Sequence, residues 1–117
     1  MSKIIHINNK EDFNREVITK SETVPVMVDF WAGWCAPCKA MNPILEEFAE
    51  NHPEIVVVKV DVEDDEGIST HYDISSIPTI LLFMNQGTKN RIIGAKSYSS
   101  LESEITSKIK KGEKKSI

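Results

Sequence analysis

Two nearly continuous apolar segments rich in β-branched residues constrain the fold of this 117-residue chain more than any other feature. They span residues 24–31 and 55–62, and a segment with helical periodicity lies between them. Strands of this composition are typical of a parallel sheet that is covered on both faces. Parallel neighbours need a long connection, which is usually a helix. The pattern therefore predicts an α/β fold around a central sheet.

Shorter patterns complete the predicted order of elements. Further strands are expected at residues 3–7, 79–84 and 91–94, with a turn at 85–87. Helices are expected at residues 9–20, 35–51 and 64–72, and a last helix begins at Ser97 or Ser99. The order β-α-β-α-β-α-β-β-α predicts a mixed sheet with helices on both faces. Most strands should be parallel, and the C-terminal hairpin antiparallel.

Length and charge narrow the class of protein. The chain suits one domain at residues 1–111, followed by a polar tail at 112–117 that we expect to fray. Its formal net charge of −4 disfavours nucleic acid and anionic membranes as partners. The sequence shows neither a signal-peptide pattern nor an apolar run of about 18 residues. We therefore expect a soluble, cytoplasmic protein, and a monomer.

The two cysteines of the chain, Cys35 and Cys38, are separated by two residues and follow the predicted strand 24–31 directly. They fall at the start of the predicted helix 35–51. A helix N-terminus favours negative charge, so it lowers the pKa of a thiol there and favours the nucleophilic thiolate. The placement therefore indicates a reactive dithiol.

The spacing of the cysteines on its own has other interpretations. It is compatible with half of a zinc site or with two small buried residues. Zinc needs further ligands, and none of His6, His52 and His71 has ligand spacing to another histidine. We therefore favour redox chemistry and expect no metal.

Two ionisable residues fall inside the predicted buried strands. Asp29 should lie on one face with Met27 and Trp31, and a buried carboxyl without a partner holds its proton with a raised pKa. Such a group can accept a proton from a nearby thiol, whereas a bulge or strand edge would leave Asp29 exposed. Lys59 is either a lysine that extends to solvent from the sheet end or a charge partner of Asp29.

Several separated motifs, taken together, resemble the thioredoxin family. They are VDFWA-x-WC-x-PCK at residues 28–39, PILEE at 43–47, KVD at 59–61, IPT at 77–79 and GA at 94–95. The resemblance extends over residues 4–109. It implies the thioredoxin fold and a protein-disulfide reductase without a bound cofactor, which works through a reversible Cys35–Cys38 disulfide.

The resemblance also implies roles for individual residues. Cys35 would be the attacking, more exposed thiol and Cys38 the resolving thiol, with Asp29 as proton acceptor and Lys59 beside it. The bond before Pro78 would be cis and face the cysteines, although the frequencies of X–Pro bonds alone favour trans. The implied substrate-binding residues are Trp34, Ala36, Pro37, Ile77, Pro78, Gly94 and Ala95.

Partners follow from the same resemblance. They would be disulfide-containing proteins as substrates and an NADPH-dependent thioredoxin reductase as electron donor. Ala36 stands where the common motif has glycine. No charged residue separates the cysteines, so we predict that the protein acts as a reductant. The alternative is a thioredoxin-like binding or structural subunit in which the cysteines are incidental.

Overall fold

A five-stranded mixed sheet organises the computed structural model, which describes residues 3–115 and the side chains of residues 3–110. The strands are β1 (Ile5–Ile7), β2 (Val26–Trp31), β3 (Val56–Asp61), β4 (Thr79–Met84) and β5 (Gly87–Ile93). Their order in the sheet is β1-β3-β2-β4-β5. The first three strands along the chain pair in parallel, which confirms the predicted core of the sheet. Antiparallel pairing already begins between β2 and β4, and β5 is antiparallel to β4.

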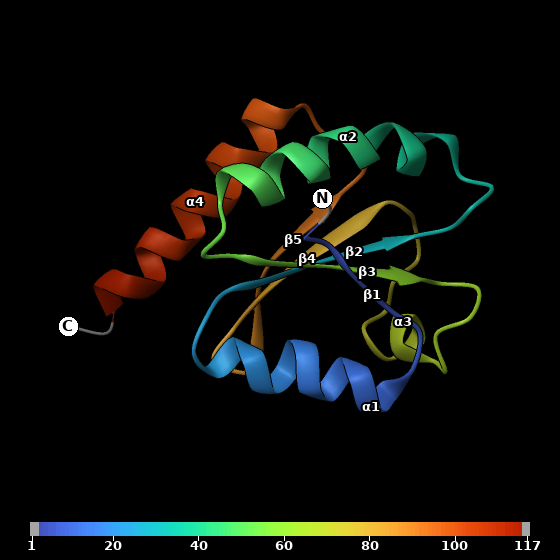
Figure 1. Ribbon diagram of the computed structural model, residues 1–117, viewed down its shortest axis with the longest axis horizontal. Helices are drawn as coiled ribbons and strands as arrows, with labels where there is room; N and C mark the ends of the chain where they lie inside the picture. Colours follow the sequence, from blue (N-terminus) through green and yellow to red (C-terminus); the bar gives the residue numbers. More distant parts are fainter. Residues whose placement is uncertain (1–2, 116–117) are drawn as a thin grey trace.

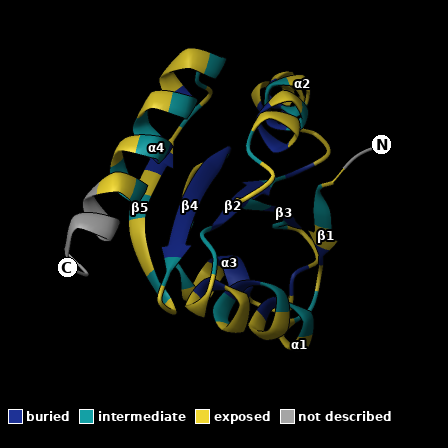
Figure 2. Cartoon of the chain, turned by 60° about the vertical axis from the view of Figure 1, so that its left-hand side comes forward, coloured by how far each residue is buried: buried dark blue, intermediate teal, exposed yellow. Residues whose placement is uncertain are grey.

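Helical segments cover both faces of the sheet (Figure 1). On one face lie α3 (Ile68–His71) and a continuous helical stretch. This stretch consists of α1 (Lys10–Phe13), the π-helical segment η1 (Asn14–Thr19) and the 3₁₀ turn η2 (Lys20–Glu22). On the opposite face lie α2 (Ala36–Asn51) and α4 (Tyr98–Lys115). Figure 2 shows the buried strands β2 and β4 between these two layers.

Capping residues place the helix starts near the predicted positions. The Asn9 side chain accepts a hydrogen bond from the backbone N–H of Asp12 at 2.8 Å. Ser97 Oγ accepts from the backbone N–H of Ser100 at 3.2 Å, so Ser97 is the cap of α4. Helix α4 continues to Lys115, beyond the predicted domain boundary at 111. The remainder of the predicted frayed tail, residues 116–117, lies outside the described residues.

Helix α3 is shorter than the predicted helix at 64–72. The Asp65 carboxylate accepts hydrogen bonds from the backbone N–H groups of Gly67 and Ser69, each at 3.0 Å. These bonds compete with helical ones, and Glu66 and Gly67 have left-handed φ angles of 55° and 86°. The helix can therefore begin only at Ile68.

The C-terminal hairpin is longer than predicted, because β5 begins at Gly87 rather than at residue 91. Its two-residue turn is Asn85-Gln86, with φ angles of 53° and 71°. Such a turn usually has glycine second. Here Ser21 supports it, since its carbonyl and its hydroxyl accept the backbone N–H groups of Asn85 and Gln86 at 2.7 and 2.9 Å.

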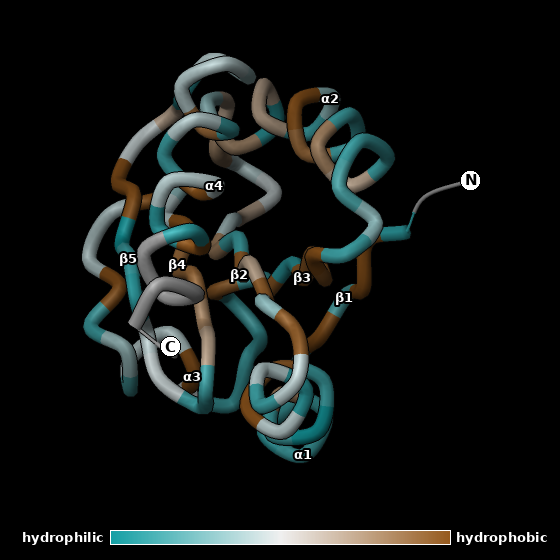
Figure 3. The backbone as a smooth tube through the Cα atoms, turned by 90° about the vertical axis from the view of Figure 1, so that its left-hand side faces the viewer, coloured by the Kyte–Doolittle hydropathy of each residue, from teal (hydrophilic) through white to brown (hydrophobic). Residues whose placement is uncertain are grey.

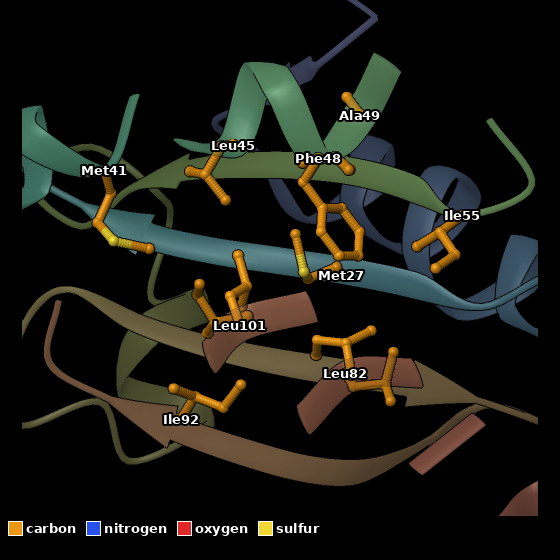
Figure 4. Packing of buried hydrophobic residues seen from close by; sticks show 12 residues of the cluster. Met27, Met41, Leu45, Phe48, Ala49, Ile55, Leu82, Ile92 and Leu101 are labelled. Atoms are coloured by element: carbon orange, nitrogen blue, oxygen red, sulfur yellow. The ribbon is translucent and has the colours of Figure 1, made fainter. Parts of the chain in front are cut away.

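The core has two layers, one on each side of the sheet. Figure 4 shows the first, where Leu45 and Phe48 of α2 and Leu101 of α4 point toward Met27 on β2. In the second layer, Val28 and Phe30 of β2 pack with residues of the α1–η1 stretch and of α3. The hydropathy colours of Figure 3 show the apolar strands between the two layers. The predicted alternation along β2 is therefore confirmed, and it directs Asp29 to the face that α2 covers.

No helix of the described residues combines the length and the apolar content needed to cross a bilayer.

Candidate active site

The two cysteines lie at the junction of β2 and α2, the loop at the right of Figure 1. Cys35 has an extended backbone and caps α2, and it forms a disulfide with Cys38. The Cys35 sulfur also accepts a hydrogen bond from the backbone N–H of Cys38 at 3.2 Å. The first sulfur therefore lies at the positive end of a 16-residue helix, with a donor aimed at it.

Both cysteines are largely covered in this disulfide form. Cys35 is 4% exposed and Cys38 is 1% exposed. With Ala32 they form a small buried cluster, against which Trp31 and Ile77 pack. Cys35 is thus the more exposed of the pair, by a small margin.

The loop that contains Pro78 lies beside the disulfide. The bond between Ile77 and Pro78 is cis, as the resemblance implied and contrary to the frequency-based expectation. The carbonyl oxygen of Ile77 is 3.9 Å from the Cys35 sulfur. The backbone N–H of Gly94 donates to the Pro78 carbonyl at 2.8 Å, and Gly94 has a left-handed φ of 90°. The structure therefore brings Cys35, Ile77, Pro78 and Gly94 together.

The other predicted substrate-binding residues differ in exposure. The Trp34 side chain is 68% exposed, a large apolar group in water directly before Cys35. Ala36, Pro37 and Ala95 are also exposed, whereas Ile77 and Gly94 are partly buried. Pro78 is buried, so its ring supports the loop from within rather than adding to the open surface.

Asp29 is fully buried, which confirms the burial predicted from its place in the strand. Its Cα is paired in register with that of Lys59 across β2 and β3. Both carboxyl oxygens are buried and have no hydrogen-bond partner among the residues that the structure describes. Burial raises the pKa of Asp29 to about 7, and the positive charge of Lys59 opposes this shift without cancelling it. Asp29 can therefore exchange a proton near neutral pH.

Lys59 is 6% exposed and lines a pocket together with Trp31 and Asp61. Its ammonium donates a hydrogen bond to Asn42 Oδ1 and lies 4.5 Å from the centroid of the Trp31 ring. Burial lowers the pKa of Lys59, while the charges of Asp29 and Glu46 oppose that effect. Lys59 thus influences Asp29 through its charge, although its hydrogen bond goes to α2.

Asn42 is the member of this group that the sequence analysis missed. It lies four residues after Cys38 on α2 and is partly buried. The sequence signal that could have identified it is a carboxamide beside the apolar stripe of a helix, one turn beyond a reactive cysteine.

The three histidines of the chain, which all lie within the described residues, are not grouped with the two cysteines as metal ligands. His52 contacts Glu54 and Glu102 at the far end of α2, and His6 and His71 are exposed. No three His, Cys, Asp or Glu side chains within the described residues come together as metal ligands would.

The sequence model of one family, Thioredoxin, matches residues 4–107. The chain belongs to the thioredoxin family. It is 41% identical over 110 residues to Thioredoxin C-2 of Corynebacterium nephridii, a match that covers 93% of this chain and 100% of that protein. It is 47% identical over 92 residues to Thioredoxin M-type, chloroplastic, of Spinacia oleracea. That match covers 78% of this chain and 50% of the spinach protein.

A solved structure supports the same conclusion about the fold. The chain superposes on mitochondrial thioredoxin 3 from Saccharomyces cerevisiae, in its oxidized form, with a TM-score of 0.77 and 28% sequence identity. The match covers 89% of this chain and 94% of the yeast chain. The predicted thioredoxin fold is therefore confirmed. With the Cys35–Cys38 disulfide at the family's Cys-x-x-Cys position, the chain is a dithiol–disulfide oxidoreductase.

Proposed function

We propose that this protein reduces disulfides in other proteins, with Cys35 as the attacking thiol. The observation that carries the proposal is the Cys35 sulfur at the start of α2, with the N–H of Cys38 directed at it. In the reduced protein, the same N–H group and helix end would stabilise a Cys35 thiolate. The thiolate is the nucleophile in disulfide exchange, so this arrangement suits Cys35 to the first step.

The reaction proceeds through a mixed disulfide. The Cys35 thiolate attacks one sulfur of the substrate, the substrate S–S bond breaks, and its second sulfur leaves as a thiolate. Cys38 then attacks the Cys35 sulfur, which releases the first substrate sulfur and forms the Cys35–Cys38 disulfide. The two electrons that reduce the substrate thus come from the two thiols of the protein. The deeper position of Cys38 supports its role in the second step.

Asp29 accepts the proton of Cys38 during the second step, directly or through water. A general base is most effective when its pKa lies near the working pH. The pKa of Asp29 is about 7, and the residue lies on the sheet face that α2 covers. Its unpartnered oxygens leave it free to take up a proton.

An extended segment of the substrate binds across the rim beside Cys35. Trp34 supplies exposed apolar surface, and the Ile77 backbone is adjacent to the sulfur. Ala36, Pro37, Gly94 and Ala95 complete this rim, while Pro78 supports it from below. Exposed apolar surface next to a reactive group is typical of a contact with another protein.

The electron donor is an NADPH-dependent thioredoxin reductase, and the protein carries electrons from it to its substrates in the cytoplasm. No charged side chain between the cysteines stabilises the thiolate further. Stronger stabilisation of the thiolate would make the disulfide a stronger oxidant, so its absence favours the reducing direction.

Reduction of insulin disulfides tests the proposed function. We expect the protein to accelerate the reaction with dithiothreitol, and then with NADPH and a thioredoxin reductase. A Cys35→Ser/Cys38→Ser variant is the matched control and should be inactive in both. A wild-type protein no faster than this variant would contradict the reductase function and favour a binding subunit.

A further inference from the structure

The Lys59 ammonium has two candidate acceptors, and its hydrogen bond goes to the neutral one. It donates to Asn42 Oδ1 on α2 and lies over the Trp31 ring. Asp29, its register neighbour on β2, receives no hydrogen bond at either oxygen. A partly buried amide therefore holds a cation that the adjacent buried carboxylate would bind more strongly.

This choice of acceptor matters for the base strength of Asp29. An ammonium in direct contact with a carboxylate lowers the pKa of that carboxylate by about 1–3 units. A carboxylate held in such an ion pair is a poor proton acceptor at neutral pH. Held by Asn42, Lys59 acts on Asp29 only through its charge at longer range.

We propose that Asn42 is a positioning residue for the exchange reaction, because it anchors Lys59 over Trp31 and prevents an ion pair between Lys59 and Asp29. This inference rests on the proposed role of Asp29 as proton acceptor. Asn42 follows Cys38 by one helical turn, so it reaches the space between the thiol end of α2 and the sheet. It touches neither the substrate nor the reacting sulfur atoms in the proposed reaction and acts through Lys59.

The charges that face this pair come from several elements. Lys59 of β3 is the charge that acts on Asp29, and on the other side of β2 the register neighbour is the apolar Ile80 of β4. Glu46 of α2 acts on Lys59 through its charge. A pocket beside Lys59 and Trp31 is lined by His6, Asp61 and Asp64, among other residues. Of these charges, only that of Lys59 has a position fixed by Asn42.

Removal of the amide should send Lys59 to Asp29 rather than to solvent. Lys59 is 6% exposed as a residue, and it lines the pocket that also contains Asp61 and Asp64. A buried ammonium without an acceptor is costly. The two unpartnered oxygens of Asp29, on the neighbouring strand, are the buried acceptors for it, and the carboxylates of Asp61 and Asp64 in the pocket beside Lys59 are the competing ones.

Titration of Asp29 in the oxidised protein tests the proposal without any substrate. The carboxyl carbon of Asp29 can be followed by NMR in wild type and in Asn42→Ala. We expect its midpoint to fall by about one pH unit or more in the variant. The pH profile of mixed-disulfide resolution should shift in the same direction. Asn42→Asp is the matched control, because it keeps an acceptor for Lys59 and adds a like charge, so the midpoint should not fall.

A double-mutant cycle separates positioning from a general packing effect. Lys59→Met should raise the Asp29 midpoint, and Asn42→Ala should cause no further fall when added to Lys59→Met. An unchanged or raised midpoint in Asn42→Ala would overturn the proposal, as would an equal fall without Lys59. A lowered midpoint with an unchanged resolution rate would contradict the proton role of Asp29 and leave Asn42 as the anchor of Lys59.

Discussion

Helix α2 has a group of ionisable residues near each end. Each group contains one carboxyl, and the pKa values of the two carboxyls are shifted in opposite directions. At the N-terminal end, Asp29 is buried without a hydrogen bond, and burial raises its pKa. At the C-terminal end, Glu102 of α4 lies 2.7 Å from His52 Nε2 and accepts the Tyr98 hydroxyl at 3.0 Å. These bonds, with that of His52 the largest cause, lower the pKa of Glu102.

The difference shows that burial and hydrogen bonds together, rather than a nearby base alone, set the pKa of a carboxyl. Asp29 and Glu102 both have a basic residue beside them, yet only Glu102 is in hydrogen-bond contact with it. A satisfied carboxylate stabilises the packing of α4 on α2 and keeps its charge. An unsatisfied one destabilises the folded protein and remains able to exchange a proton, which is common at functional sites.

Single substitutions at the two ends of α2 should give the largest difference in disulfide-reduction activity. Cys35→Ser should abolish disulfide reduction, because it removes the attacking sulfur, and Cys38→Ser should accumulate a mixed disulfide with the substrate. Glu102→Gln, at the other end of α2, should retain activity close to wild type. Insulin reduction and mass spectrometry of trapped complexes measure these outcomes. Turnover by Cys35→Ser would refute the assignment of the attacking thiol.

Loss of the buried carboxyl should have the next largest effect on rate. Asp29→Asn keeps the shape of the side chain and removes its ability to take a proton, so resolution by Cys38 should slow by about 100-fold. The first attack by Cys35 should change far less. Rapid-mixing measurements on a disulfide substrate separate the two steps. Equal rates in variant and wild type at both steps would exclude Asp29 as the proton acceptor.

Local patterns were enough to predict most of the fold. The β-branched segments and the helical periodicity gave the element order, and the alternation along β2 gave the burial of Asp29. The length of α3 could not be predicted in this way, because it depends on Asp65 binding the backbone of the residues that follow it. The antiparallel pairing of β4 with β2 was not predicted, because only the final hairpin was expected to be antiparallel and strand patterns have the same appearance in either direction.

Contacts between segments that are far apart in the sequence explain which features of the site could not be predicted. The spacing of Cys35 and Cys38 indicated a dithiol, but only the family resemblance implied the cis bond before Pro78. The role of Lys59 was undecided, because Asn42 is 17 residues away in sequence and on another layer. A lysine in a strand does not reveal which of two buried oxygens its ammonium reaches.

The buried carboxyl of Asp29, which has no hydrogen bond, should also make the free energy of unfolding depend on pH. The pKa of Asp29 rises from 3.8 to about 7 on folding, so the folded protein holds a proton that the unfolded chain has released between these pH values. Stability from this group is therefore greatest below pH 4 and falls as pH rises to about 7. Asp29→Asn should remove this slope and be up to about 4 kcal/mol more stable at pH 8. Denaturation of the oxidised protein from pH 4 to 8 measures the slope.

An exposed carboxyl supplies the control for that experiment. Asp73 is on the surface, so Asp73→Asn should retain the wild-type slope. Parallel curves for Asp29→Asn and wild type would show that Asp29 ionises equally in the folded and unfolded states, which its burial opposes.

The smallest effect should come from the hydrogen-bonded pair His52 and Glu102 at the C-terminal end of α2. Partial burial disfavours a charge on His52, but its contacts with Glu102 and Glu54 outweigh this and raise its pKa above 6.5. Its stabilising contribution is therefore complete below pH 6.5 and is lost as pH rises through the folded pKa. The Tm of wild type should exceed that of His52→Gln by about 1–2 °C more at pH 6 than at pH 8.

Part of the His52 contribution should remain at pH 8, because its ring lies 4.6 Å from that of Phe48 and this packing does not need a charge. Glu102→Gln removes one of the two carboxylates that contact His52, so in this background the pH-dependent part should be smaller. A Tm difference that grows from pH 6 to pH 8 would contradict a raised pKa for His52. It would also remove the contrast between the two ends of α2, since the contact with Glu102 would then not stabilise the charged form of His52.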